Sequence, residues 1–260
     1  MRFVPATLIS LLIALPAYGQ NIEWQDFDFT LGGSALYHPD YLGSNDYEFG
    51  FAPDAEVVWQ KTLFVSSKNG AGVYIVDYPH SRFGVSIAPD FGRSEDTNPR
   101  LAGLGDVDFG WQMRVFGDLT YEPFIVGASA RLGFAGGSDG QMILAYAGLR
   151  KELIPNLIGQ MTVGTSWAGA TWGNEYYGVN AAQAASSGLP QYRVNNGFRD
   201  AALSGSLSYK LTPAVALTGS ARWTHLLGDV ADSPIVEETN NLTLGLGLTY
   251  SMTTFPAPLN

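Results

Sequence analysis

Cysteine is absent from this chain of 260 residues, and histidine occurs only at His38, His80 and His225. A chain without cysteine cannot form a disulfide framework or a thiolate metal centre. The three histidines do not fall into a metal-binding spacing such as HExxH. We therefore expect neither a metal site nor a bound cofactor.

Charge is scarce and mostly negative. Asp, Glu, Lys and Arg together make up 15% of the residues, and the formal net charge is -10. Proteins that bind nucleic acid use basic surfaces to neutralise the phosphates. The acidic balance therefore argues against nucleic acid as a partner.

Long apolar runs are missing except at the N-terminus. Gly, Pro or charge interrupts every later apolar stretch, although hydrophobic residues make up 46% of the chain. No later segment reaches the ~20 apolar residues of a transmembrane helix. The chain begins with Arg2, an apolar stretch at 3–15 and the ending Pro16-Ala17-Tyr18-Gly19. This pattern predicts a secretory signal peptide over residues 1–19, because the alternative, a membrane anchor, needs a longer apolar run.

Alternation of apolar with small or polar residues is the main pattern in the rest of the chain. In 242–250, four leucines and Tyr250 alternate with Thr and Gly, which predicts a strand with one apolar face. Similar segments lie at 27–37, 107–115, 124–134, 160–167, 203–211 and 215–224, and weaker ones at 48–60, 63–67, 71–77, 82–91 and 141–151. The total is about twelve strands. In 141–151 both phases are apolar, so either one could face lipid.

A soluble sandwich and a membrane barrel both use alternating strands. The faces between the apolar ones are polar here and the segments are long, which favours lipid outside and a polar lumen inside. The mean hydropathy of +0.03 fits this reading, because alternation hides a membrane barrel from hydropathy analysis. We predict an all-β chain with a closed antiparallel transmembrane β-barrel over 20–252 and a short tail over 253–260.

The connections between these strands sort by length. Long ones lie at 37–47, 92–105, 136–140, 168–198 and 226–239, and short ones at 60–62, 78–81, 117–120, 153–156 and 211–213. The two kinds tend to alternate, which predicts long extracellular loops and short periplasmic turns. Aromatic residues on the apolar phase gather at strand ends, as expected for two interfacial belts.

Few residues suggest chemistry. His80 and Ser81 are adjacent, but a polar turn explains them better than a catalytic pair. Several charged residues lie on inward phases of the predicted strands: Asp28, Asp108, Arg114, Arg131, Lys210 and Arg222. They either line a pore or neutralise one another inside a filled barrel, and we favour the second.

Three loop motifs carry a resemblance to a known family. The first is Gly92-Arg93 followed by Gly103-Leu104-Gly105-Asp106, and the second is Tyr176-Tyr177-Gly178-Val179 with Ser187-Gly188-Leu189-Pro190-x-Tyr192. The third is Leu226-Leu227-Gly228-Asp229-x-Ala231-Asp232-Ser233-Pro234-Ile235-Val236. Together they resemble the signatures of the MltA-interacting protein/OmpV family of outer-membrane proteins. The candidate functional residues on this basis are Arg93, Gly105, Asp106, Tyr177, Gly178, Gly188, Pro190, Tyr192, Gly228, Asp229, Asp232, Ser233 and Pro234.

The resemblance implies a barrel in the outer membrane of a Gram-negative bacterium, in contact with lipid and lipopolysaccharide. It also implies a non-enzymatic scaffold that links a lytic transglycosylase to a murein synthase. A narrow channel for a small solute and a lipid-modifying enzyme are the alternatives. One departure is that Tyr250-Ser251-Met252 stands where family chains end on an aromatic residue.

Overall fold

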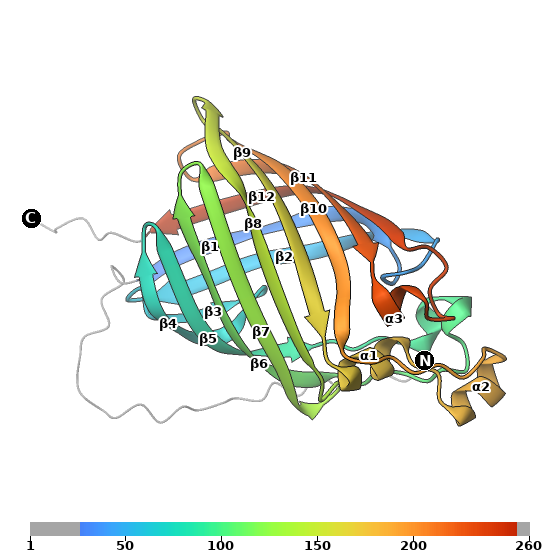
Figure 1. The fold of residues 1–260 in the computed structure, drawn as a ribbon. Coiled ribbons are helices and arrows are strands. Elements are labelled where there is room, and N and C mark those ends of the chain that lie inside the picture. Colours follow the sequence, from blue (N-terminus) through green and yellow to red (C-terminus); the bar gives the residue numbers. More distant parts are fainter. Residues whose placement is uncertain (1–26, 254–260) are drawn as a thin grey trace, which may run out of the picture.

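The chain forms a closed antiparallel barrel of twelve strands in the computed structural model, which describes residues 27–253 (Figure 1). Strand β1 (Phe27–Pro39) pairs with β2 (Tyr47–Trp59) on one edge and with β12 (Asn240–Thr253) on the other. This last pairing closes the ring, so the predicted twelve-stranded barrel is confirmed.

The remaining strands follow one another around the ring in chain order. They are β3 (Leu63–Ser66), β4 (Gly70–Tyr78), β5 (Ser81–Asp90), β6 (Gly110–Tyr121), β7 (Phe124–Gly136), β8 (Gln141–Ile154), β9 (Leu157–Ala168), β10 (Gly197–Lys210) and β11 (Val215–Leu226). Strand β6 starts three residues later than the expected Val107, and β12 includes Thr253, which we had assigned to the tail. The expected signal peptide and the rest of the tail lie outside the described residues.

The apolar phase of the strands faces outward. Leu246 and Leu248 of β12 are 59% and 51% exposed to the surroundings, as expected for side chains in contact with lipid. The structure also decides the phase of β8, which the sequence left open. Ile143 and Leu149 point outward, whereas Met142 is buried.

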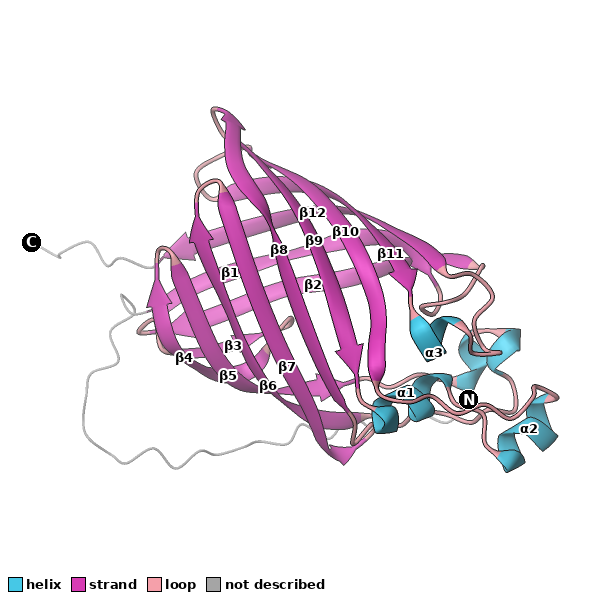
Figure 2. Cartoon of the chain, in the orientation of Figure 1, coloured by secondary structure: helices cyan, strands magenta, loops and turns pink. Residues whose placement is uncertain are grey.

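The two ends of the barrel differ (Figure 2). Five connections at one end are short turns, whereas the other end carries helices α1 (Ala170–Tyr177), α2 (Ala181–Ser187) and α3 (Gly228–Ala231) and the 3-10 turns Glu95–Thr97 and Pro99–Leu101. The long loops define the extracellular end. No helix within residues 27–253 is long and apolar enough to cross a membrane.

Aromatic rings cluster at both ends, as the belt pattern predicts. Tyr37 stacks on Tyr47 and contacts Phe49 at the extracellular end, with ring centroids 5.1 Å apart in each pair. At the periplasmic end Phe27 stacks on Trp59 at 6.4 Å. Amphipathic rings are favoured at the two membrane interfaces.

The β3–β4 hairpin is an exception to the regular wall. Strand β3 has 4 residues, whereas β2 has 13, so the hairpin ends part of the way up the barrel. Its tip is fixed by Ser67, whose Oγ donates to the carbonyl of Pro53 and accepts from the amide of Ala55. The next two residues, Lys68 and Asn69, line the lumen.

The first prediction concerns topology. Ala185 of α2 is exposed, whereas the neighbouring Ser187 is half-buried, so Ala185→Cys is the better probe of this loop. The cysteine should react with an impermeant thiol reagent on intact cells, because the loop is extracellular. Lys151→Cys at the opposite end should react only after the outer membrane is permeabilised. The reverse labelling pattern would invert the assigned orientation.

The second prediction concerns the lipid face. Leu246→Arg should prevent assembly, because an outward arginine near the bilayer midplane costs about 2–4 kcal/mol. Ser220→Arg is the matched control: Ser220 faces the lumen opposite Gly245, whose missing side chain leaves room. Heat-modifiable mobility on gels measures assembly, and equal behaviour of the two variants would contradict the assigned faces.

Candidate functional site

The long loops fold into a cap over the extracellular end of the barrel. One cluster of buried side chains joins the loops at 40–46, 91–109, 169–196 and 227–239: Tyr41, Leu101, Leu104, Val179 and Ile235. A second cluster comprises Tyr177, Val194, Leu226 and Val230. Leu101 and Ile235 are 0% exposed, so the cap has a hydrophobic core of its own.

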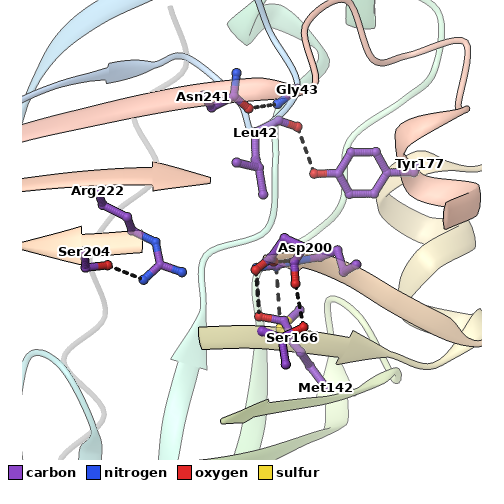
Figure 3. Close-up of polar contacts among 11 residues, drawn as sticks. Leu42, Gly43, Met142, Ser166, Tyr177, Asp200, Ser204, Arg222 and Asn241 are labelled. Atoms are coloured by element: carbon purple, nitrogen blue, oxygen red, sulfur yellow. Dashed lines mark hydrogen bonds and ion pairs between the residues drawn. The ribbon is translucent and has the colours of Figure 1, made fainter. Parts of the chain in front are cut away.

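Most family-signature residues hold this cap together. The hydroxyl of Tyr177 donates to the carbonyl of Leu42 at 2.8 Å (Figure 3), and Ser233 Oγ donates to the carbonyl of Tyr177 at 2.6 Å. Tyr192 donates to the carbonyl of Asp229 at 2.7 Å. Burial raises the pKa of Tyr177 to about 12, so its hydroxyl stays a hydrogen-bond donor at neutral pH.

Two arginines bind backbone carbonyls within the cap. Arg93 donates to the carbonyl of Tyr176, and Arg100 donates to the carbonyl of Pro234. Burial lowers the pKa of Arg93, because desolvation disfavours the charged form. Irregular loops leave carbonyls without strand or helix partners, and the arginine forks satisfy them.

The smaller signature residues shape the loop backbone. Gly105 and Gly188 both have a φ of +76°, and Gly188 ends α2 in the left-handed conformation. Asp106 accepts from the amide of Glu95 at 2.8 Å. Asp229 accepts two hydrogen bonds from Asn195, which lower the pKa of its carboxyl.

The other signature residues have local roles. Gly228 has a φ of +54° and begins α3, while the amide of Asp232 donates to the carbonyl of Gly228 at 3.2 Å. Gly178 ends α1, and Pro190 is exposed beyond α2. Most residues of the three loop motifs thus contribute to the fold of the cap.

Two buried amides of the cap were not identified from the sequence. Asn98 Nδ2 donates to Asp40 Oδ2 at 2.7 Å and to Asp46 Oδ2 at 3.1 Å. Asn241 accepts from the amide of Gly43 at 2.7 Å and donates to the carbonyl of Ser44 (Figure 3). Both tie the first loop to the rest of the cap. A single asparagine carries no periodic signal, so no pattern in the sequence indicates this role.

Below the cap the lumen holds a cavity of about 470 Å³. Arg114, Arg131 and Arg222, three of the predicted lumen charges, line it, and Arg222 donates to Ser204 Oγ at 3.2 Å (Figure 3). Lys210 is exposed at the periplasmic end of β10 and does not line this cavity. Asp108 lies outside the lumen, because it precedes β6 and borders a depression of about 790 Å³ on the cap.

In the described part of the chain the lumen arginines do not form ion pairs with inward carboxylates, although we expected the inward charges to neutralise one another. Residues 27–253 contain two ion pairs, Arg82 with Asp77 and Arg199 with Asp200. The second pair also binds Ser166 beneath the cap (Figure 3). Neither pair includes Arg114, Arg131 or Arg222.

An aromatic layer from β3, β4 and β6 lines the lumen on the periplasmic side of these arginines. Phe64 stacks on Tyr74 with ring centroids 4.3 Å apart, and Phe116 meets both rings edge-on. Tyr74 donates to Glu56 Oε1 at 2.5 Å, and Arg82 lies 4.7 Å over the Tyr74 ring. Phe64 and Tyr74 are buried, so this layer narrows the lumen.

The structure places His80 and Ser81 at the periplasmic turn between β4 and β5. The His80 ring hydrogen-bonds the carbonyl of Thr120 at 3.1 Å and stacks on Tyr121 at 5.4 Å. These contacts are those of a packed turn. Across the described part of the chain no three His, Asp or Glu side chains gather as a metal site.

Comparison with known proteins agrees with the loop motifs. A family model described as MltA-interacting protein MipA matches residues 31–252. The chain belongs to this family. Two relatives, the MltA-interacting proteins of Escherichia coli (strain K12) and Shigella flexneri, are each 33% identical over 88 residues. The match covers 34% of this chain and 35% of each relative, about a third of their length.

Solved structures resemble this family member in fold. The NanC porin matches with a TM-score of 0.47 and 9% identity, over 85% of this chain and 98% of the porin. An outer membrane channel from Pseudomonas putida F1 matches with a TM-score of 0.45 and 10% identity, over 87% of this chain and 96% of the channel. Family membership, the closed barrel and its outward apolar face together place the protein in the outer membrane of a Gram-negative bacterium.

The third prediction tests the cap. Ser233→Ala removes the hydrogen bond to the carbonyl of Tyr177 and the acceptor for the amide of Ile235, both buried. The expected cost is about 1–3 kcal/mol, confined to the cap. Proteinase K should cleave the loops of intact cells faster, while heat-modifiable mobility of the barrel stays unchanged. Ser186→Ala, at an exposed helix position, is the control, and equal protection of both variants would contradict this role.

Proposed function

We propose that this outer-membrane barrel is a non-enzymatic scaffold that binds a lytic transglycosylase at its periplasmic end and brings it together with a murein synthase. The observation that carries the proposal is the closure of the extracellular end by the cap, whose core residues are buried. A partner in the periplasm meets the opposite end. The name of the Escherichia coli relative, MltA-interacting protein, supports this choice of partner.

The interior also supports a scaffold over a narrow channel for a small solute. A solute would have to pass the cap and then a lumen that Phe64, Tyr74 and Phe116 narrow. Both obstacles are well-packed groups of large side chains, which are costly to open. The barrel therefore suits anchoring better than conduction.

The periplasmic end offers a surface of suitable character. A hollow of about 380 Å³ lies between the turns, lined by carboxylates and by Lys61 and Arg82. At the same end the β8–β9 hairpin projects beyond the rest of the wall (Figure 1), because β8 continues past Leu149, the last of its residues that pairs with β7. Leu153 and Ile154 at the tip are 55% and 59% exposed. These two exposed apolar side chains are the contact site that we propose for the partner.

The fourth prediction tests this surface. The mature protein, immobilised in detergent, should capture a purified lytic transglycosylase, and Leu153→Asp with Ile154→Asp should weaken capture about tenfold or more. Leu211→Asp is the matched control, because Leu211 is 52% exposed on another periplasmic turn. Failure of the unmodified protein to bind the enzyme, from pure solution and from envelope extract, would refute the proposed function.

A further inference from the structure

The barrel wall has a gap in its extracellular half, between β2 and β5. Strand β2 pairs with β3 only over Glu56 to Trp59, although it pairs with β1 along its whole length. On the other side, the pairing of β4 with β5 ends at Ala71 opposite Ile87. Above the β3–β4 hairpin, the facing edges of β2 and β5 therefore have no strand between them.

Proline occurs in both strands that border the gap. The amide of Ser67 donates to the carbonyl of Ala55 at 2.8 Å, so odd-numbered residues of β2 direct their backbone groups toward this edge. Pro53 is one of these odd-numbered residues, so it faces the gap with a position that lacks an amide donor. Pro89 lies at the extracellular end of β5. Proline is confined to edge positions in sheets, where it discourages pairing with another strand. The two prolines thus favour a gap that stays free of β-strands.

Large apolar side chains mark the rims of the gap on the membrane side. Phe49 and Phe51 of β2 are 84% and 72% exposed and lie against Tyr37 and Gly33 of β1, and Phe91, which follows β5, is 79% exposed and packs on Phe109. No other large apolar side chain in residues 27–253 is as exposed as these three. The inward positions between Phe49 and Pro53 are Gly50 and Ala52, so no bulky side chain of β2 points into the opening.

Two arginines face each other inside the barrel behind the gap. Arg114 of β6 and Arg131 of β7 are direct register partners, and both line the cavity. Like charges directly opposite each other are unfavourable unless something compensates them. Arg131 makes no hydrogen bond or ion pair within the described part of the chain.

Arg114 connects this pair to the gap. It donates to the carbonyl of Lys68 and to Asn69 Oδ1, at the hairpin tip that forms the lower rim. Its buried Nε and the buried hydroxyl of its register partner Ser86 have no hydrogen-bond partner within residues 27–253. Unsatisfied donors and an excess of positive charge therefore meet behind an apolar opening, because the cavity lining sets Lys68 and four arginines against Asp54, Glu56 and Asp118.

We propose that this cavity binds an amphiphile with an anionic headgroup, which enters from the outer leaflet between β2 and β5. Its phosphate or carboxylate accepts hydrogen bonds from Arg114 and Arg131, and its apolar chain lies between Phe49, Phe51 and Phe91. Arginine forks bind such oxyanions in bidentate fashion. The site is separate from the periplasmic hairpin, so a test of this site does not depend on whether the proposed scaffold function is correct.

The first experiment tests the headgroup site, with monododecyl phosphate and inorganic phosphate as probes of the purified protein in non-ionic detergent. Monododecyl phosphate should bind, and the double variant Arg114→Gln with Arg131→Gln should bind it about tenfold or more weakly. Lys210→Gln, which removes an inward charge outside the cavity, should leave binding unchanged. The double variant removes a repulsion, so it should assemble normally as judged by heat-modifiable mobility.

The second experiment tests the route. Ala52→Trp narrows the opening and should slow transfer of monododecyl phosphate from phosphatidylcholine vesicles into the reconstituted protein. The control Ala35→Trp, on the lipid face of β1 opposite Phe51, should leave the rate of transfer unchanged. If inorganic phosphate binds as tightly as monododecyl phosphate, the proposal that the ligand is an amphiphile is wrong. If neither probe binds, the proposed headgroup site is wrong. A dimer in solution that Ala52→Trp dissociates would show that a second copy covers the gap, and would overturn the route.

Discussion

The structure depends on one constraint: inside a bilayer every backbone amide and carbonyl needs a partner within the protein. The pairing of β1 with β12 meets this constraint by closing the ring, from Asp28 opposite Thr253 to Tyr37 opposite Leu244. Closure makes each strand alternate between lipid and lumen, and it sends all connections to the two ends. The cap, the cavity and the periplasmic hairpin are built on this frame.

The three loop motifs lie in the cap, where packing and hydrogen bonding are specific to each residue. A strand residue needs only the right polarity on the right face, so many sequences serve equally well. In the loops each carbonyl and amide needs its own partner, such as Ser233 for Tyr177 or Asn241 for Gly43 and Ser44. Substitution there leaves a buried group unsatisfied.

The two ends and the lumen suit different tasks. The closed extracellular end and the projecting β8–β9 hairpin direct any protein partner to the periplasm. The short β3–β4 hairpin serves the interior: its aromatic side chains narrow the lower lumen, and its tip meets Arg114 below the gap. A gap in the wall relaxes the closure constraint locally, and Pro53 removes one amide that would otherwise lack a partner there.

The sequence by itself determined the barrel, a count of about twelve strands and the lipid face of most strands. The reason is that a period of two is a local property, which separates the lipid-facing from the lumen-facing side chains within each strand. The sequence could not determine the phase of β8, where Met142 and Ile143 are both apolar and only the neighbouring strands decide. The alternation in the sequence predicted a strand that includes Asp108. In the structure Val107 instead pairs with Arg93 in the loop, and β6 begins only at Gly110. The pairing of Arg114 with Arg131, the aromatic layer and the gap arose only in the tertiary structure, because ring closure and register bring together residues that are far apart in the chain.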